Sequence, residues 1–324
     1  HSDSRFDLRI RGNAMTVDLA SLAREITAGD QHASRIPAGY TYLGQMISHD
    51  IVAATRPESD SRVVRPRLSL DSLYGLTSQG TSDYLTGGCF SHDPERPWDV
   101  KRDDSGRALI PEPRNDENII IAQLHRVWQK VHDRLFEHRR SERIAHEHTV
   151  LLFQTVVIED YLQRILQPHI FDAYFRRGER HLAFDESKIA PEFARAAFRF
   201  GHSMVRRSYA LNDEHRAVKL IDMFRRGSRI SQSFRISWRR FFEIEPDFRP
   251  QHAMGIDASI SADMTSVTSP DGVAQNVVLR NLEAGAELRP GLEYVAALQQ
   301  GVDDLPRVDP RLHLRPIDND RTIA

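Results

Sequence analysis

The chain has 324 residues, which is enough for one large hydrophobic core or two modest domains. Its content of 40% hydrophobic and 28% charged residues is typical of an ordinary soluble globular protein. The 44 basic and 46 acidic side chains give a net charge of -2. This balance excludes a general electrostatic attraction to nucleic acid or to an anionic membrane.

The single cysteine, Cys89, excludes an internal disulfide framework and any multi-cysteine metal site, so a metal ion must use histidine or oxygen ligands. No apolar run approaches the roughly 18 residues that a membrane-spanning helix needs, and no charged-then-apolar start indicates a signal peptide. The chain nevertheless begins at His1 without an initiator methionine. Export after removal of a leader therefore stays open beside a cytoplasmic location, and the sequence does not indicate an oligomeric state.

The first part of the chain is polar and mixed, and we interpret residues 1–34 as an N-terminal arm with one short helix over Val17–Ile26. A turn signal at Ile36–Gly39 precedes Tyr40–Val52, where apolar residues recur near helical spacing and predict a helix. Residues 53–113 are rich in Ser, Asp, Gly, Pro and Arg. A connection of this length indicates a functional or wrapping loop.

The strongest predicted helix is Ile119–Arg139, because apolar residues form a stripe along one of its faces. A second helix, over Thr149–Leu166, is predicted to be largely buried. Further helices are predicted over Phe193–Ser208, Ser237–Phe242, Asn276–Ala286 and Gly291–Gln299. Clean alternating strands are almost absent, so we expect a mainly α fold with long connecting loops.

The segment Ala196–Val205 is apolar and helical in character, with Gly201 followed by His202 at its centre. Glycine costs about 1 kcal/mol relative to alanine inside a helix, and one reason for it would be a large flat group lying against the helix. His202 could then be an axial ligand to an iron in that group. The alternative is a buried histidine bonded to a neighbouring carbonyl, which this segment alone favours.

Gln45 and His49 are four residues apart and therefore share one helix face. A histidine not bound to metal, beside an amide that holds a water, could move a proton between the two oxygens of a peroxide. The alternative is a capping or core histidine. For His125 and His132, on the long predicted helix, we favour packing and surface roles.

The residues that open the long helix include Arg114, whose permanent charge could polarise a bound peroxide. Asp116 and Glu117 follow it. Their attraction to the positive end of the helix dipole is a sufficient structural explanation for them.

Together these motifs resemble the animal-type haem peroxidase superfamily (the peroxidase–cyclooxygenase group) in its compact bacterial form. The matching segments follow the family's order: Gln45–Asp50, Arg114–Glu117, Leu124–Leu135, Ala197–His202 and Leu279–Gly285. The resemblance implies a mainly α catalytic domain over residues 35–300, followed by a tail at 301–324. Haem would lie between Tyr40–Val52, the Arg114/Glu117 helix and Phe193–Ser208.

By this resemblance His202 would be the proximal ligand of the haem iron. Asn281 would accept the proton of its other ring nitrogen, and Arg199 would bind a haem propionate. On the opposite side His49 would be the distal acid and base. Gln45 would be its neighbour for water and halide, and Arg114 would stabilise the departing oxygen.

The family's activity implies reduction of hydrogen peroxide and oxidation of small donors, such as phenols, iodide or thiocyanate, through a ferryl haem. A fatty-acid dioxygenase is the alternative, but it needs a tyrosine three residues before the proximal histidine. Arg199 stands there, and Tyr174 and Tyr209 are elsewhere. A haem-binding protein with little turnover is a third hypothesis, since the chain stops soon after Gln299, where the family continues with further helices.

Two family carboxylates form ester bonds to haem methyl groups. Glu117 matches one of them, whereas Ser48 stands in place of the other. Asn118 stands where one mammalian member has a sulfonium-forming methionine. The cofactor is therefore expected to be haem b tied through one ester or none.

Calcium is also implied by the resemblance. Asp50, directly after His49, matches a calcium ligand of the family, and residues 65–75 resemble its calcium loop with the positions of Ser69 and Asp71 exchanged. The alternative is that Asp50 caps a helix and Asp71 forms a turn.

Overall fold

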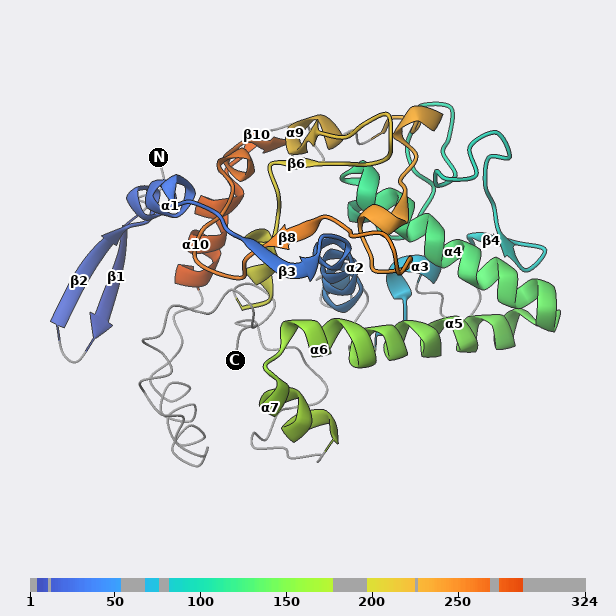
Figure 1. Ribbon diagram of the computed structural model, residues 1–324, viewed down its shortest axis with the longest axis horizontal. Helices are drawn as coiled ribbons and strands as arrows, with labels where there is room; N and C mark the ends of the chain where they lie inside the picture. The colour runs from blue at the N-terminus through green and yellow to red at the C-terminus, as the bar shows by residue number, and fades with distance from the viewer. Residues whose placement is uncertain are drawn as a thin grey trace.

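Three helices pack against the core of the protein in its computed structural model (Figure 1). α4 (Ile119–Arg139) and α5 (Glu142–Val156) run side by side, and α2 (Gly39–Ala53) packs against α4. The core lies between them and residues 204–256, and its fully buried side chains include Met46, Ile120, Phe153, Met204 and Phe241. These elements confirm the predicted mainly α fold. The structure describes residues 5–10, 13–53, 68–75, 82–176, 197–224, 227–268 and 274–287.

The ends of α4 agree with the predicted helix, and the local sequence explains both of them. At the start, the Asn118 side chain accepts hydrogen bonds from the backbone N–H groups of Ile120 and Ile121, each at 3.0 Å. At the end, Arg140 adopts a left-handed conformation with φ 54° and turns the chain into α5. The cap and the turn therefore fix the length of the longest helix.

The second long helix differs from its prediction. Ser141 caps it by accepting from the backbone N–H of Ile144 at 3.4 Å, so α5 begins well before the predicted Thr149. Leu151 and Leu152 are 58% and 46% exposed, so the prediction of a largely buried helix is wrong: α4 covers only one of its faces. The helix continues through a π-helical turn, η2 (Val157–Tyr161), into α6 (Leu162–Ile165).

Two glycines allow close packing around α2. A Cβ atom at Gly39 would lie 2.4 Å from the ring of Phe242, and one at Gly44 would lie 2.4 Å from the hydroxyl of Tyr161. The backbone N–H of Gly39 also donates to the carbonyl of Phe241 at 2.9 Å. α2 is thereby held among the segments that surround it.

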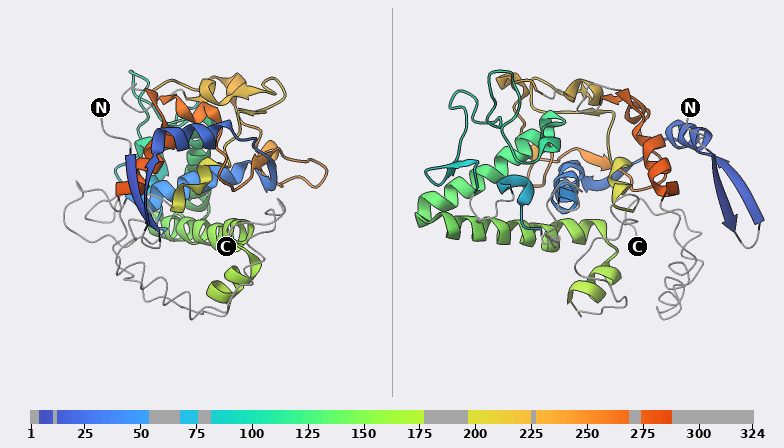
Figure 2. Two further views of the ribbon diagram at one scale, coloured as in Figure 1. Left: turned by 90° about the vertical axis from the view of Figure 1, so that its left-hand side faces the viewer. Right: turned by 180° about the vertical axis from the view of Figure 1, so that it is seen from behind.

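The described strands form five short antiparallel pairs: β1 (Arg5–Ile10) with β2 (Asn13–Asp18), β3 (Ala33–Pro37) with β8 (His252–Met254), β4 (Leu85–Thr86) with β5 (Cys89–Phe90), β6 (Ser208–Tyr209) with β7 (Val218–Lys219), and β9 (Val267–Thr268) with β10 (Ala274–Gln275). The β1–β2 hairpin projects from the body of the protein (Figures 1 and 2). It leads into α1 (Leu19–Ala28), and the side chain of Asp18 caps the start of this helix. α1 lies close to the predicted helix at Val17–Ile26. The proposed boundaries of arm, domain and tail stay predictions, and the tail lies outside the described residues.

The predicted helix over Phe193–Ser208 is wrong in its second half. Its described part is a 3-10 helix, η4 (Ala197–His202), and Ser208 already belongs to β6. The carbonyls of residues 203–205 are taken by tertiary partners: the Gln31 side chain donates to the first and third, and the backbone N–H of Met254 donates to the second. These bonds compete with helix continuation.

The remaining helical elements are short, apart from α10 (Val277–Glu287), which agrees with the predicted helix at Asn276–Ala286. They are α3 (Asp71–Tyr74), η1 (Pro113–Asp116), α7 (Pro168–Phe171), η3 (Asp172–Arg176), α9 (Leu220–Met223), η5 (Gln232–Phe234), η6 (Trp238–Arg240) and η7 (Ala262–Thr265). The predicted helix at Gly291–Gln299 lies outside the described residues. Among the helices that are described, none has the length and apolar character needed to cross a bilayer.

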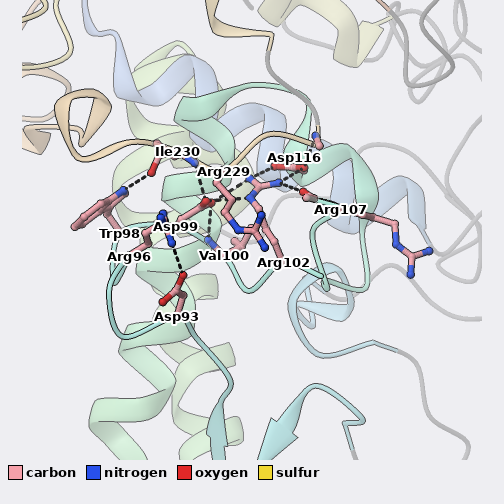
Figure 3. A network of polar contacts seen from close by, with 12 residues as sticks. Asp93, Arg96, Trp98, Asp99, Val100, Arg102, Arg107, Asp116, Arg229 and Ile230 are labelled. Carbon is pink, nitrogen blue, oxygen red and sulfur yellow. Dashed lines mark hydrogen bonds and ion pairs between the residues drawn. The ribbon is translucent and has the colours of Figure 1, made fainter. Parts of the chain in front are cut away.

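A buried ion cluster centred on Arg102 braces the loop before α4 (Figure 3). The Arg102 side chain is 3% exposed; it donates to Asp99 at 2.9 and 3.0 Å and to Asp116 at 2.6 and 2.7 Å. Asp99 and Asp116 also accept from the backbone N–H groups of Ile230 (2.9 Å) and Gly227 (3.4 Å). The cluster thus ties η1 to residues 227–230. It also gives Asp116 a partner that the sequence did not predict, because the Asp116 carboxylate binds Arg102.

We predict that Arg102→Met lowers the free energy of unfolding by about 3–5 kcal/mol, because it leaves two buried carboxylates without their counter-charge. The control is Arg107→Met, which removes an ion pair to Asp103. The Arg107 side chain is 78% exposed, so this loss should be much smaller than that of Arg102→Met. Denaturant titration measures both losses. Equal losses would show that the cluster does not act as a buried unit.

Candidate active site

A cavity of about 300 Å³ lies among α2, η1 and η4. Three segments that are far apart in the sequence meet around it. Its lining contains the following residues singled out from the sequence: Gln45, Ser48, His49, Arg114, Glu117, Asn118, Arg199, Gly201 and His202. The rest of the lining includes the apolar side chains of Leu220, Phe224 and Val277 and the polar side chains of Thr41, Gln275 and Arg280. The cavity therefore combines polar groups with apolar wall, as small-molecule sites usually do.

His49 stands on α2 and is 7% exposed. Its Nδ1 atom lies 2.8 Å from Oδ1 of Asn115, and Nδ2 of Asn115 lies 3.0 Å from Nδ1 of His125. Asn115 and His125 are both fully buried. The role favoured for His125 was packing or a surface position, and the structure places it behind His49 through Asn115. His132, by contrast, is a buried packing residue bonded to the hydroxyl of Tyr74 and the carbonyl of Gly88.

Arg114 is oriented by Glu112, a residue that the sequence analysis missed. Its Nε and Nη2 atoms donate to the two carboxylate oxygens at 2.9 and 3.0 Å, and Nη2 also donates to the carbonyl of His49 at 3.2 Å. Burial acts to raise the pKa of Glu112, but the hydrogen bonds and charge of Arg114 outweigh it and lower the pKa to about 2. The sequence feature that could have indicated this role is an acidic residue at the N-cap of η1, two residues before the arginine.

Glu117 lies between η1 and α4, and its Oε2 atom accepts from Nε2 of Gln45 at 3.2 Å. Arg114 and Glu117 therefore precede the long helix, whereas they were expected to open it. The reason is Asn118, whose side chain caps the first turn of α4. Ser48 lines the same cavity as Glu117.

His202 ends η4, and its Nδ1 atom lies 2.6 Å from Nδ2 of Asn281 on α10. Burial, together with the charge of Arg199, lowers the pKa of His202 to about 4, so its imidazole is neutral near pH 7. Asn281 was expected to accept a proton from this ring. Its amide is turned the other way, because Nη1 of Arg199 can only donate and lies 2.8 Å from Oδ1 of Asn281.

Asp50 is 4% exposed, and its two carboxylate oxygens accept from the backbone N–H groups of Leu70 (3.1 Å) and Ser72 (2.9 Å). Burial raises the pKa of Asp50 to about 6, and the nearby charge of Asp71 acts in the same direction. Asp71 also interacts with Ser69. Among the described residues, no group of three or more His, Cys, Asp or Glu side chains is arranged to hold a metal ion. The capping alternative for Asp50 thus accounts for its contacts.

The burial of His125 predicts a dependence of stability on pH. Burial, aided by the charge of Arg126, lowers the pKa of His125 to about 3. Between the ordinary pKa of about 6.5 and this value, the unfolded chain binds a proton that the folded chain does not. The stability that the neutral ring contributes is therefore lost as pH falls through this window.

We predict that His125→Gln flattens the plot of unfolding free energy against pH between about 6.5 and 3. At about 1.4 kcal/mol per pKa unit, the two curves should converge by several kcal/mol over that window. His138→Gln, at an exposed position on α4, serves as the control and should keep the wild-type slope. Parallel curves for wild type and His125→Gln would contradict the burial of a neutral ring.

Comparison with known proteins gives three findings. A family model described as animal haem peroxidase matches residues 76–268, and human thyroid peroxidase is 30% identical over 121 residues. That alignment spans 33% of this chain and 13% of the length of thyroid peroxidase. The solved structure of peroxidase A from Dictyostelium discoideum superposes over 92% of this chain and 73% of its own, with a TM-score of 0.62 at 15% identity, which shows a shared fold.

The matched region contains Arg114, Glu117 and His202, whereas His49 and Asn281 lie outside it and are placed by geometry alone. Because the family model matches more than half of its residues, this chain belongs to the animal haem peroxidase family.

Proposed function

We propose that the protein is a haem peroxidase that reduces hydrogen peroxide and oxidises small donors such as phenols, iodide or thiocyanate. One observation carries the proposal: His49 and Arg114 line the same cavity as His202, although the two histidines are 153 positions apart in the sequence. A peroxidase needs an acid and base facing one side of its haem iron and an axial ligand on the other side.

The residues around the cavity fit a haem group. The imidazole of His202 is neutral and lines the cavity, with Nδ1 taken by Asn281, so Nε2 is the nitrogen that would bind iron. A Cβ atom added at Gly201 would meet no atom within 4 Å, so the backbone beside the histidine borders open space. Bound haem would supply the iron that exchanges electrons with peroxide and donor.

Binding through Nε2 requires Nδ1 of His202 to carry the proton. The amide of Asn281 must then present its oxygen to this ring, and Arg199 must donate to another acceptor. A haem propionate is such an acceptor, and Arg199 lines the cavity. The three side chains would therefore rearrange together when haem binds.

On the opposite side His49 would take a proton from one peroxide oxygen and return it to the other, which then leaves as water. Arg114 would stabilise the negative charge that develops on the departing oxygen. Its bonds to Glu112 and to the carbonyl of His49 hold the guanidinium beside that histidine. Gln45 would hold a water molecule at the same wall.

We predict that His202→Ala abolishes stable haem binding, because the axial bond and its asparagine contact are lost together. His49→Ala should keep haem and lose peroxidase rate by a factor on the order of 100 or more. His169→Ala, at an exposed position on α7, should change neither property. Absorption spectra and steady-state turnover with a phenolic donor measure the effects.

Normal spectra and rates in both site variants would show that the site is assigned wrongly. Haem binding without turnover in the wild-type protein would favour the hypothesis that this is a haem-binding protein with little turnover. The dioxygenase alternative needs a tyrosine near the haem, and Tyr42 and Tyr161 line the cavity. This alternative is therefore tested as well. Oxygen uptake with a polyunsaturated fatty acid would favour that alternative, and we expect none.

A further prediction concerns the covalent state of haem. Glu117 is the cavity carboxylate that matches an ester-forming family residue, and the Ser48 hydroxyl cannot supply a second ester. Acidified-solvent extraction and intact mass after peroxide treatment should find haem tied at one point or not at all in the wild type, and at no point in Glu117→Ala. With at most one ester, the protein should oxidise phenols, iodide or thiocyanate in preference to chloride. Covalent haem in Glu117→Ala, or vigorous chloride oxidation by the wild type, would contradict this account.

We also propose a calcium ion beside Asp50 and Asp71, whose charges are close enough for one to raise the pKa of the other. An ion between them would relieve this repulsion. Elemental analysis after dialysis should find about one calcium per chain, and chelation should lower the melting temperature of the wild type. Asp50→Asn should lose the response to chelation. No ion and no effect of chelator would leave Asp50 as a cap and Asp71 as a turn residue.

A further inference from the structure

Asn115 joins two buried histidines that come from different helices. Its Oδ1 atom lies 2.8 Å from Nδ1 of His49 on α2, and its Nδ2 atom lies 3.0 Å from Nδ1 of His125 on α4. The exposed fractions of Asn115, His125 and His49 are 0%, 0% and 7%. The amide is therefore shielded from water on both sides, and its partners decide how it is oriented.

The orientation of this amide determines where each ring carries its proton. An amide oxygen only accepts a hydrogen bond and an amide nitrogen only donates, while a neutral imidazole has one donor and one acceptor nitrogen. With Oδ1 of Asn115 toward His49, Nδ1 of His49 must carry the proton and Nε2 must keep its lone pair. With Nδ2 toward His125, Nδ1 of that ring must be the acceptor.

His125 is the neutral end of this chain. Its burial and the neighbouring charge of Arg126 keep the ring neutral near pH 7, so one of its two nitrogens is an acceptor. The amide nitrogen of Asn115, which can only donate, faces Nδ1 and makes Nδ1 that acceptor. Nε2 then carries the proton, and it is buried with no hydrogen-bond partner among the described residues. An unsatisfied buried donor is destabilising, so packing alone is a poor explanation for a histidine at this position.

We propose that Asn115 and His125 are positioning residues that hold His49 as the Nδ1–H tautomer, so that its Nε2 lone pair is available to take a proton in the cavity. This inference rests on the proposed function. When Nε2 takes the proton, the resulting imidazolium donates from both nitrogens, and Oδ1 of Asn115 still accepts from Nδ1. No hydrogen bond behind His49 has to break during the transfer, which is the advantage of a preorganised site.

The position of Asn115 is itself fixed by the buried cluster in Figure 3. Asn115 lies in η1 directly before Asp116, which is bonded twice to Arg102. Arg114 lies directly before it and lines the cavity. One braced turn thus orients both the fixed charge of the site and the amide behind its base.

The test is the tautomer of His49, read from two-bond nitrogen–proton correlations of the protein labelled with 15N-histidine, with signals assigned by loss in His49→Gln and His125→Gln. We expect a proton on Nδ1 of His49 and on Nε2 of His125 in the wild type. Asn115→Leu should move the proton of His49 to Nε2 in part of the molecules. Asn115→Asp keeps an acceptor and should retain the wild-type tautomer.

The rate of reaction with hydrogen peroxide, measured on the haem-loaded protein at pH 7, should fall roughly tenfold to a hundredfold in Asn115→Leu, the range typical of a lost orienting hydrogen bond. Gln123→Leu is the matched control, since it removes another buried amide from α4, bonded to the backbone of Phe234 and Ile236. It should lower stability and leave both the tautomer and the rate unchanged.

A wild-type His49 protonated on Nε2 would overturn the inference, as would an Asn115→Leu variant with wild-type tautomer and rate. If that variant does not fold, the wild-type spectrum alone decides. If the protein binds no haem, the proposed function fails, while the tautomer still shows whether Asn115 orients His49.

Discussion

The turn Pro113–Asp116 is the constraint on which the cavity depends. Its last residue is fixed from behind by Arg102, a buried cation shared between two carboxylates. Because this turn is braced, Arg114 and Asn115 project from it in defined directions, one into the cavity and one between two buried histidines. Burying charged groups costs desolvation energy, which offsets much of their mutual attraction. What this cluster contributes is therefore a single, fixed position for the backbone of the turn.

The site and the groups behind it combine neutral histidines with a paired charge. Burial lowers the pKa of His202 and of His125, so both rings stay neutral near pH 7. Arg114, by contrast, keeps its charge and is compensated by Glu112. A neutral imidazole offers a lone pair to a metal or a hydrogen-bond donor, whereas a paired arginine offers a positive charge of fixed direction. In this site, therefore, histidine supplies a lone pair and arginine supplies the positive charge.

Sequence reasoning predicted what local rules determine. The boundaries of α4 follow from the Asn118 cap and the apolar stripe. The polar residues singled out in the sequence motifs, among them His49, Arg114 and His202, line one cavity. The missed features depend on contacts between distant segments. The helix expected after His202 gives way because Gln31 and Met254 take its carbonyls. His125 is linked to His49 only because η1, which carries Asn115, packs against α2.

The central claim is that haem bound in this cavity reacts with peroxide beside His49 and Arg114. The most direct measurement is an optical titration of the purified wild-type protein with haem, followed by hydrogen peroxide and then a phenolic donor. The account predicts saturation at one haem per chain with the spectrum of a histidine-ligated iron, a spectral change within seconds of adding peroxide, and return to the starting spectrum with the donor. Absence of saturable haem binding, or a haem complex whose spectrum does not respond to peroxide, would contradict it.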